Sequence, residues 1–111
     1  MACTINRPLI FSISGAWAGT QTNDNGLYPQ NIAFELTGNS DFLVKDNIGT
    51  LAAKGTYTFS NNIINGSYKQ FSSGETFSFT GAFDPATQKL SCTLGTGTAT
   101  TGQGKWVATK K

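Results

Sequence analysis

Histidine is absent from the chain, and only two cysteines, Cys3 and Cys92, occur among its 111 residues. Histidine is the most common general base, the usual zinc ligand and the side chain that titrates near neutral pH. Two cysteines are too few for a disulfide-bonded scaffold, and we expect Cys92 to be a free, buried thiol rather than a partner of Cys3. The sequence therefore predicts no metal site, no cofactor and no catalytic nucleophile.

Charged residues and long apolar runs are also scarce. Charged side chains make up 13% of the chain, against roughly 25% in an average protein. The net charge of +2 is too small to indicate a nucleic-acid partner or a membrane partner. No run of apolar residues is longer than three, so no membrane span is expected.

The N-terminal segment lacks the features of a signal peptide. Residues 1–13 have neither the positively charged start nor the long apolar stretch that such a peptide needs, so we expect none in this chain. Cys3 is followed by a polar segment, which also fits the lipid-attachment cysteine of a trimmed bacterial lipoprotein. An ordinary tail is the simpler interpretation, and the compartment stays open, with the periplasm and the cell exterior included.

Turn-forming residues divide the chain at nearly regular intervals. Seven clusters rich in Asn, Asp, Gly, Ser or Pro separate segments that have no helical periodicity. They predict one β-domain over residues 12–111, after a tail at 1–11. The expected strands are 12–23, 29–38, 41–45, 50–59, 63–71, 75–83, 89–96 and 103–110.

Alternation within these strands assigns one face to the interior and the other to solvent. The outward face carries the charged residues Glu35, Lys45, Lys54, Lys69 and Lys105, while Glu75 begins a strand and is placed at the rim. The predicted inward residues are Ile13, Gly15, Trp17, Gly19, Ile32, Phe34, Leu36, Phe42, Val44, Leu51, Ala53, Gly55, Tyr57, Phe59, Ile64, Gly66, Tyr68, Gln70, Phe77, Phe79, Gly81, Phe83, Leu90, Cys92, Leu94, Thr96, Gly104, Trp106 and Ala108.

A glycine precedes an aromatic residue by two positions at five places. Residues two apart lie on the same face of a strand, and the glycine leaves room for a ring on a neighbouring strand and lets the strand bend. Eight antiparallel strands in hairpin order avoid exposed edges best by closing on themselves. The predicted fold is an all-β, eight-stranded antiparallel up-and-down barrel, with an open sheet or a two-sheet sandwich as the alternative. The five pairs are Gly15/Trp17, Gly55/Tyr57, Gly66/Tyr68, Gly81/Phe83 and Gly104/Trp106.

The segment Gly15-Ala-Trp17 resembles the Gly-x-Trp motif of the calycin superfamily, which includes lipocalins and avidins. The resemblance implies an eight-stranded barrel over residues 12–110 whose tryptophan closes one end. The chain lacks the lipocalin Thr-Asp-Tyr motif and an arginine to stack on Trp17, and no avidin biotin pocket can be aligned. It is most similar to small lipocalin-like barrels of bacteria.

In such a barrel the mouth lies opposite Trp17, where the loops 22–30 and 95–103 meet the turns near 47 and 73. We expect the interior to bind a small apolar or amphipathic molecule, with Gln21, Tyr68 and Gln70 holding its polar end. The predicted ligand-binding residues are Gln21, Tyr68, Gln70, Phe77, Leu94, Thr96 and Trp106.

Two other functions remain open. Eight-stranded barrels are just wide enough to be filled by side chains, so this one can be a packed protein that self-associates or recognises partners through its surface. Phe71 and Val107 point outward in the predicted register and would serve such a homo-oligomer. A shape-directed cyclase or isomerase is the other alternative, with Tyr68, Gln70 or Glu75 orienting the substrate.

Overall fold

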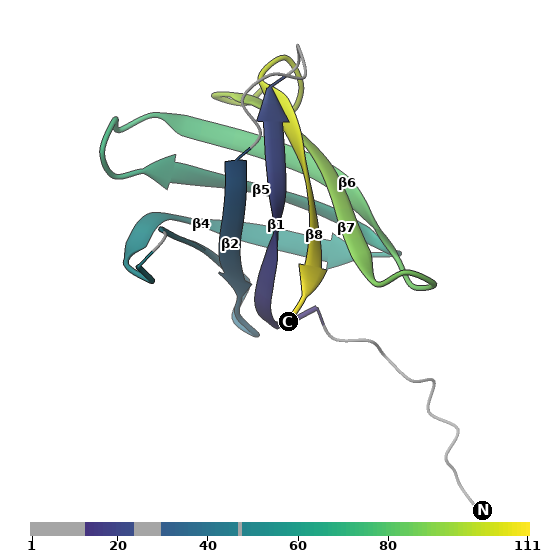
Figure 1. Ribbon diagram of the computed structural model, residues 1–111. Helices are drawn as coiled ribbons and strands as arrows, with labels where there is room; N and C mark the ends of the chain where they lie inside the picture. Colours follow the sequence, from purple (N-terminus) through teal and green to yellow (C-terminus); the bar gives the residue numbers. More distant parts are fainter. Residues whose placement is uncertain (1–12, 24–29, 47) are drawn as a thin grey trace, which may run out of the picture.

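The computed structural model describes residues 13–23, 30–46 and 48–111, and all regular structure in these residues is β-strand (Figure 1). The predicted tail and Cys3 lie outside the described residues. No helix in the described part is long and apolar enough to cross a membrane. The strands are β1 (Gly15–Asn23), β2 (Gln30–Leu36), β3 (Asp41–Lys45), β4 (Leu51–Ser60), β5 (Ile63–Gln70), β6 (Thr76–Asp84), β7 (Lys89–Thr96) and β8 (Gly104–Lys110).

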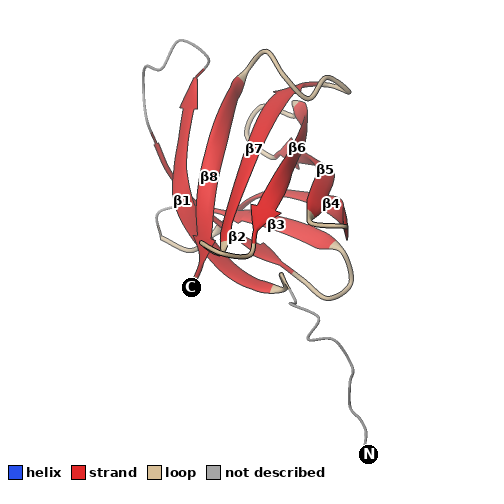
Figure 2. Cartoon of the chain, turned by 90° about the vertical axis from the view of Figure 1, so that its right-hand side faces the viewer, coloured by secondary structure: helices blue, strands red, loops and turns tan. Residues whose placement is uncertain are grey.

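Each strand pairs antiparallel with the next, and β8 returns to pair with β1. The sheet is therefore a closed meander barrel, which confirms the predicted fold and excludes the open sheet and the sandwich. In Figure 1, β1, β2 and β8 cross steeply in front of β4 and β5. Figure 2 shows β1, β8, β7 and β6 side by side along one wall.

The predicted inward face forms the core. Every hydrophobic side chain that is buried in the described residues, from Ile13 to Ala108, belongs to the inward set. The register explains this agreement, because Trp17 lies opposite Phe34 and Gly81 lies opposite Cys92, so inward residues face inward neighbours on adjacent strands. Thr96, at the end of β7, pairs with the inward-facing Phe77 but is exposed.

Aromatic rings fill the lumen. Phe42 lies at their centre, with ring centroids 4.7 Å from Phe79, 5.0 Å from Phe34 and 5.4 Å from Tyr68. Trp106 adds a further contact, with its centroid 4.9 Å from that of Phe34. Each such pair contributes about 0.5–1.5 kcal/mol beyond the burial of its area. The core thus depends on rings that come from strands on opposite walls.

Trp17 is fully buried near the end that holds the β6–β7 turn. Its indole Nε1 donates a hydrogen bond to the carbonyl oxygen of Ile13 over 2.8 Å, and Phe83 packs edge-on against its ring at 6.2 Å. Both the polar and the apolar parts of the side chain therefore have partners.

Glycine serves two different purposes in the wall. A Cβ atom at Gly66 would lie 2.5 Å from Cζ of Phe79, so this glycine does leave room for a ring, as predicted. At Gly55 the close neighbours are instead the backbone of Ser67 and Tyr68. Gly55 therefore allows the backbones of β4 and β5 to approach closely, and it does not make room for an aromatic ring.

Replacing Gly66 by alanine should destabilise the barrel by about 1–3 kcal/mol, because the added methyl group overlaps the Phe79 ring and the carbonyl oxygen of Thr56. Urea unfolding followed by tryptophan fluorescence measures the change. Gly38→Ala is the matched control, since the nearest atom to its Cβ would be 3.9 Å away. Equal unfolding midpoints for the two variants would contradict this account of Gly66.

Candidate functional site

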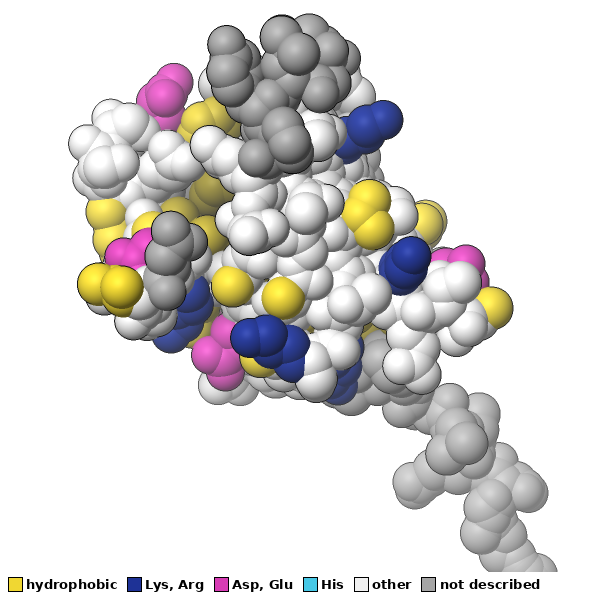
Figure 3. Space-filling view, viewed as in Figure 1, with side chains coloured by type: hydrophobic (Ala, Val, Ile, Leu, Met, Phe, Trp, Pro, Cys, Tyr) yellow, Lys and Arg dark blue, Asp and Glu magenta, His cyan; other side chains and the backbone are white. Residues whose placement is uncertain are grey.

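A hollow opens at the end of the barrel opposite Trp17. Its volume is about 230 Å³, and it lies where β1 ends, β2 begins and β5 ends. Figure 3 shows this hollowed region between the β5–β6 turn and β2, with hydrophobic side chains at its base. The residues that line it are Gln21, Gln30, Asn31, Ile32, Val44, Lys45, Ala52, Ala53, Tyr68, Gln70 and Ser72.

A much smaller void lies beneath the hollow. Its volume of about 30 Å³ corresponds to one water-sized group. It shares four lining residues with the hollow and adds three rings of the core, so the two spaces adjoin. The shared residues are Gln21, Ile32, Val44 and Tyr68, and the added rings are Phe34, Phe42 and Trp106.

The structure brings together only some of the predicted site residues. Gln21, Tyr68 and Gln70 line the hollow, and Trp106 lines the void below it. Phe77 and Leu94 are buried within the packed core and line neither space, while Thr96 is exposed and lines neither. The space available to a ligand is therefore a shallow mouth above a filled interior.

Ile32 and Val44 line the hollow, although they are absent from the predicted site. The sequence places both on the inward face, which is the correct signal. It does not give the stagger between strands: Val44 pairs with Phe34, and β3 ends one residue later at Lys45. That stagger brings the middle of β2 and the end of β3 up to the mouth.

Tyr68 forms the floor of the hollow. Its side chain is only 8% exposed, and its hydroxyl makes no hydrogen bond with a described residue. Its ring is held in place by Phe77, at a centroid distance of 5.6 Å, and by Phe42. Burial raises the pKa of Tyr68 to about 12, so the hydroxyl stays protonated and available as a donor.

Tyr57 shows what a satisfied buried phenol looks like in the same barrel. It is as buried as Tyr68, but its hydroxyl donates a hydrogen bond to the carbonyl oxygen of Thr37 over 2.6 Å. Buried hydroxyl groups normally have such a partner. The Tyr68 hydroxyl has no such partner among the described residues and is therefore the unusual group, and its side chain lines the hollow.

Amide side chains surround the hydroxyl on two sides of the mouth. Gln21 lies on β1 opposite both Gln30 of β2 and Trp106 of β8. Across the hollow, Oε1 of Gln70 accepts a hydrogen bond from the Ser73 hydroxyl over 3.3 Å, which orients this amide within the β5–β6 turn. Amides both donate and accept, so the rim suits a neutral polar group.

The described residues offer little support for nucleophilic, acid–base or metal chemistry at the mouth. Cys92 is free and buried, and burial raises the pKa of its thiol to about 12, which makes it a poor nucleophile. Glu75 is exposed and does not line the hollow. No group of three or more acidic, cysteine or histidine side chains is close enough to hold a metal ion in the part of the chain that the structure describes.

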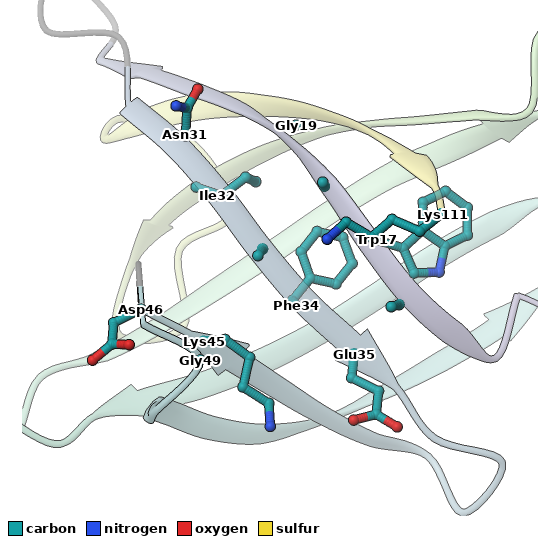
Figure 4. A pocket seen from close by; sticks show the side chains of 13 residues that line it. Trp17, Gly19, Asn31, Ile32, Phe34, Glu35, Lys45, Asp46, Gly49 and Lys111 are labelled. Carbon is teal, nitrogen blue, oxygen red and sulfur yellow. The ribbon is translucent and has the colours of Figure 1, made fainter.

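A wider depression of about 610 Å³ lies on the outer surface of β1, β2 and β3 (Figure 4). Ala16, Ala18 and Ala33 belong to its lining, and in Figure 4 the side chain of Lys111 lies across β1 and β2. The charged residues that line this depression, Glu35, Lys45, Asp46 and Lys111, are half-buried or exposed. The mouth hollow is the candidate site because the buried Tyr68 lines it.

Comparisons with protein-family models, with curated proteins and with solved structures find no match to this chain. The closed eight-stranded barrel is compatible with a calycin-like fold. Membership of that superfamily stays a prediction, carried by Gly15 and Trp17.

Tyr68→Phe should leave the stability of the free protein unchanged or raise it slightly, because it removes a hydroxyl that has no hydrogen-bond partner in the described part of the chain and keeps the ring. Tyr57→Phe should lower the stability by about 1 kcal/mol, since it breaks the bond to the Thr37 carbonyl oxygen, which keeps only the N–H of Ser40 as a donor. Urea unfolding of the two variants makes the comparison. A loss of stability in Tyr68→Phe as large as in Tyr57→Phe would show that the Tyr68 hydroxyl has an internal partner.

The stability of the protein should fall as the pH rises from 10 to about 12, because the Tyr68 phenol ionises at its ordinary pKa of 10.0 in the unfolded chain but at about 12 in the barrel. The stabilising effect is complete below pH 10 and is lost above it. Cys92 adds a loss in the same direction from its ordinary pKa of 9.0 upward. Unfolding midpoints measured between about pH 8 and pH 12 should decline less steeply above pH 10 in Tyr68→Phe; parallel curves for the two proteins would be inconsistent with a buried Tyr68.

Proposed function

We propose that the protein binds a small amphipathic molecule at the mouth of the barrel and that a hydrogen-bond acceptor of the ligand reaches the Tyr68 hydroxyl. The observation that carries the proposal is the hydroxyl of the buried Tyr68, which lines an open hollow and has no hydrogen-bond partner among the described residues. A hydrogen bond between this hydroxyl and a ligand acceptor would contribute about 0.5–1.5 kcal/mol net to binding. A carbonyl, hydroxyl or ether oxygen has the required chemistry.

The size of the hollow limits the ligand. At about 230 Å³ it is smaller than the pockets of roughly 300–1,000 Å³ that hold drug-sized molecules. The ligand is therefore a small molecule or the polar end of a larger one. Gln21 and Gln70 are positioned to bond its remaining polar atoms, while Ile32, Val44 and Ala52 contact its carbon atoms.

The calycin resemblance supports this proposal at the level of architecture. We infer a calycin-type barrel from the Gly-x-Trp segment, the closed meander and the buried Trp17. A ligand held at the open end, away from the tryptophan, agrees with that inference. This barrel differs from one that holds a ligand deep inside, because its interior rings leave a space of only about 30 Å³ beneath the mouth.

The filled interior also favours a second candidate, a packed barrel whose function lies on its outer surface. Ring contacts among Phe34, Phe42, Phe79 and Trp106 occupy the space that a deep ligand would need. Catalysis by shape has less support, because Glu75 is exposed outside the hollow and leaves only Tyr68 and Gln70 as orienting groups.

Native mass spectrometry on protein purified gently from its own source tests the ligand proposal. We expect an added mass that disappears on denaturation and gives the formula of the ligand. Tyr68→Phe should then bind the identified molecule about tenfold more weakly, since one buried hydrogen bond is lost. Ser91→Ala on the exposed outer face is the control and should bind normally. A clean apo mass would favour the packed barrel, and an unchanged affinity in Tyr68→Phe would remove this residue from the site.

A further inference from the structure

Two of the buried aromatic side chains that carry a polar hydrogen have a partner for it. The indole N–H of Trp17 donates to the carbonyl oxygen of Ile13 over 2.8 Å, and the hydroxyl of Tyr57 donates to the carbonyl oxygen of Thr37 over 2.6 Å. Buried tyrosine and tryptophan side chains usually have such a partner, because an unpaired donor in the interior is costly. Trp17 and Tyr57 therefore represent the ordinary state of a buried aromatic donor in this barrel.

Tyr68 and Trp106 differ from this ordinary state. Tyr68 is 8% exposed and Trp106 is 2% exposed, and neither the hydroxyl nor the indole N–H makes a hydrogen bond with a described residue. Both side chains line the void of about 30 Å³ beneath the hollow. The two buried aromatic donors that have no partner in the described part of the chain thus line the same small space.

The rings around the void hold one another in place. The ring centroid of Phe42 lies 5.0 Å from that of Phe34 and 5.4 Å from that of Tyr68, and the centroid of Trp106 lies 4.9 Å from that of Phe34. Closely packed core side chains cannot shift without disturbing their neighbours. The void therefore keeps its size, which suits about one non-hydrogen atom.

The lining of the void favours a neutral acceptor. Its polar side chains are those of Gln21, Tyr68 and Trp106, and none of the described residues that line it is charged. An ionised carboxylate would lose its hydration there without gaining a cation. The oxygen of a neutral carbonyl group is bonded to one atom only and has two lone pairs, so it can enter a narrow space and accept from two donors. An ether oxygen carries two carbon atoms, and a hydroxyl group brings a further donor.

We propose that the void binds the oxygen of a neutral carbonyl group, which accepts hydrogen bonds from the Tyr68 hydroxyl and the Trp106 indole N–H together. This inference rests on the proposed function and names its class of ligand, a small ketone, aldehyde, ester or amide whose carbon skeleton stays in the hollow. Gln21, Ile32, Val44 and Tyr68 line both spaces, so the carbonyl group lies where the two adjoin. Trp106, which lines the void and not the hollow, is the added recognition residue.

Titration of the full chain with cyclohexanone, a small neutral ketone, tests the proposal by proton–nitrogen correlation NMR. The chain has two tryptophans, so each indole N–H can be followed separately. We expect cyclohexanone to move the proton signal of the Trp106 indole downfield, because this N–H gains an acceptor. The Trp17 signal should stay in place, since its N–H is already bonded to Ile13. Methylenecyclohexane, which has a CH₂ group in place of the oxygen, should not produce the downfield shift.

Two variants separate this inference from the proposed function. Tyr68→Phe should weaken cyclohexanone binding roughly tenfold, since one of the two hydrogen bonds is lost. Tyr57→Phe is the matched control, because it makes the same chemical change at a hydroxyl that has a partner, and Tyr57 lines neither space. It should bind cyclohexanone as the unchanged protein does. Circular dichroism checks that both variants fold.

Each other outcome overturns the inference in a different way. If binding depends on Tyr68 but the Trp106 signal responds alike to cyclohexanone and methylenecyclohexane, the oxygen does not enter the void, and the proposed function stands without this inference. Binding that is equally strong in Tyr68→Phe would remove Tyr68 from the site and overturn both. A failure of cyclohexanone to bind would overturn the carbonyl assignment, and native mass spectrometry would still decide the proposed function.

Discussion

The packing of aromatic rings around Phe42 is the interaction on which the rest of the structure depends. Phe34, Phe42, Tyr68, Phe79 and Trp106 come from β2, β3, β5, β6 and β8, so their contacts tie both walls of the barrel together. An eight-stranded barrel needs its lumen filled, and here rings do most of the filling. The same rings decide where a ligand can bind, because they leave open only the space above them.

Tyr68 belongs to this cluster and to the candidate site at once. Its ring contributes to the core through Phe42, Phe77 and Phe79, whereas its hydroxyl has no partner among the described residues. A phenylalanine would supply the same ring contacts without the buried donor. A residue that departs from the best choice for stability is the usual mark of a functional position. This conflict within one side chain supports the site more strongly than the shape of the hollow alone.

The sequence predicted the fold well because alternation is a local property. Each buried side chain, such as Leu36 or Leu90, reveals its face through its immediate neighbours, and turn residues mark where strands end. The candidate site was harder to predict from the sequence, since its position depends on the stagger between strands and on how closely the rings pack. Neither quantity can be read from one strand, which is why Val44 was missed at the mouth. The same limit applies to Phe77 and Leu94, which are buried and do not line the hollow.

The end of β5 links the two surfaces of the barrel. Gln70 lines the hollow, and the next residue, Phe71, is exposed. Because successive residues of a strand point to opposite faces, the same strand end presents an amide to the hollow and a ring to the outside. Hydrogen bonds at Gln70 and Phe71 fix the β5–β6 turn, so the amide at the mouth is held by the wall of the barrel and not by the ring-filled core.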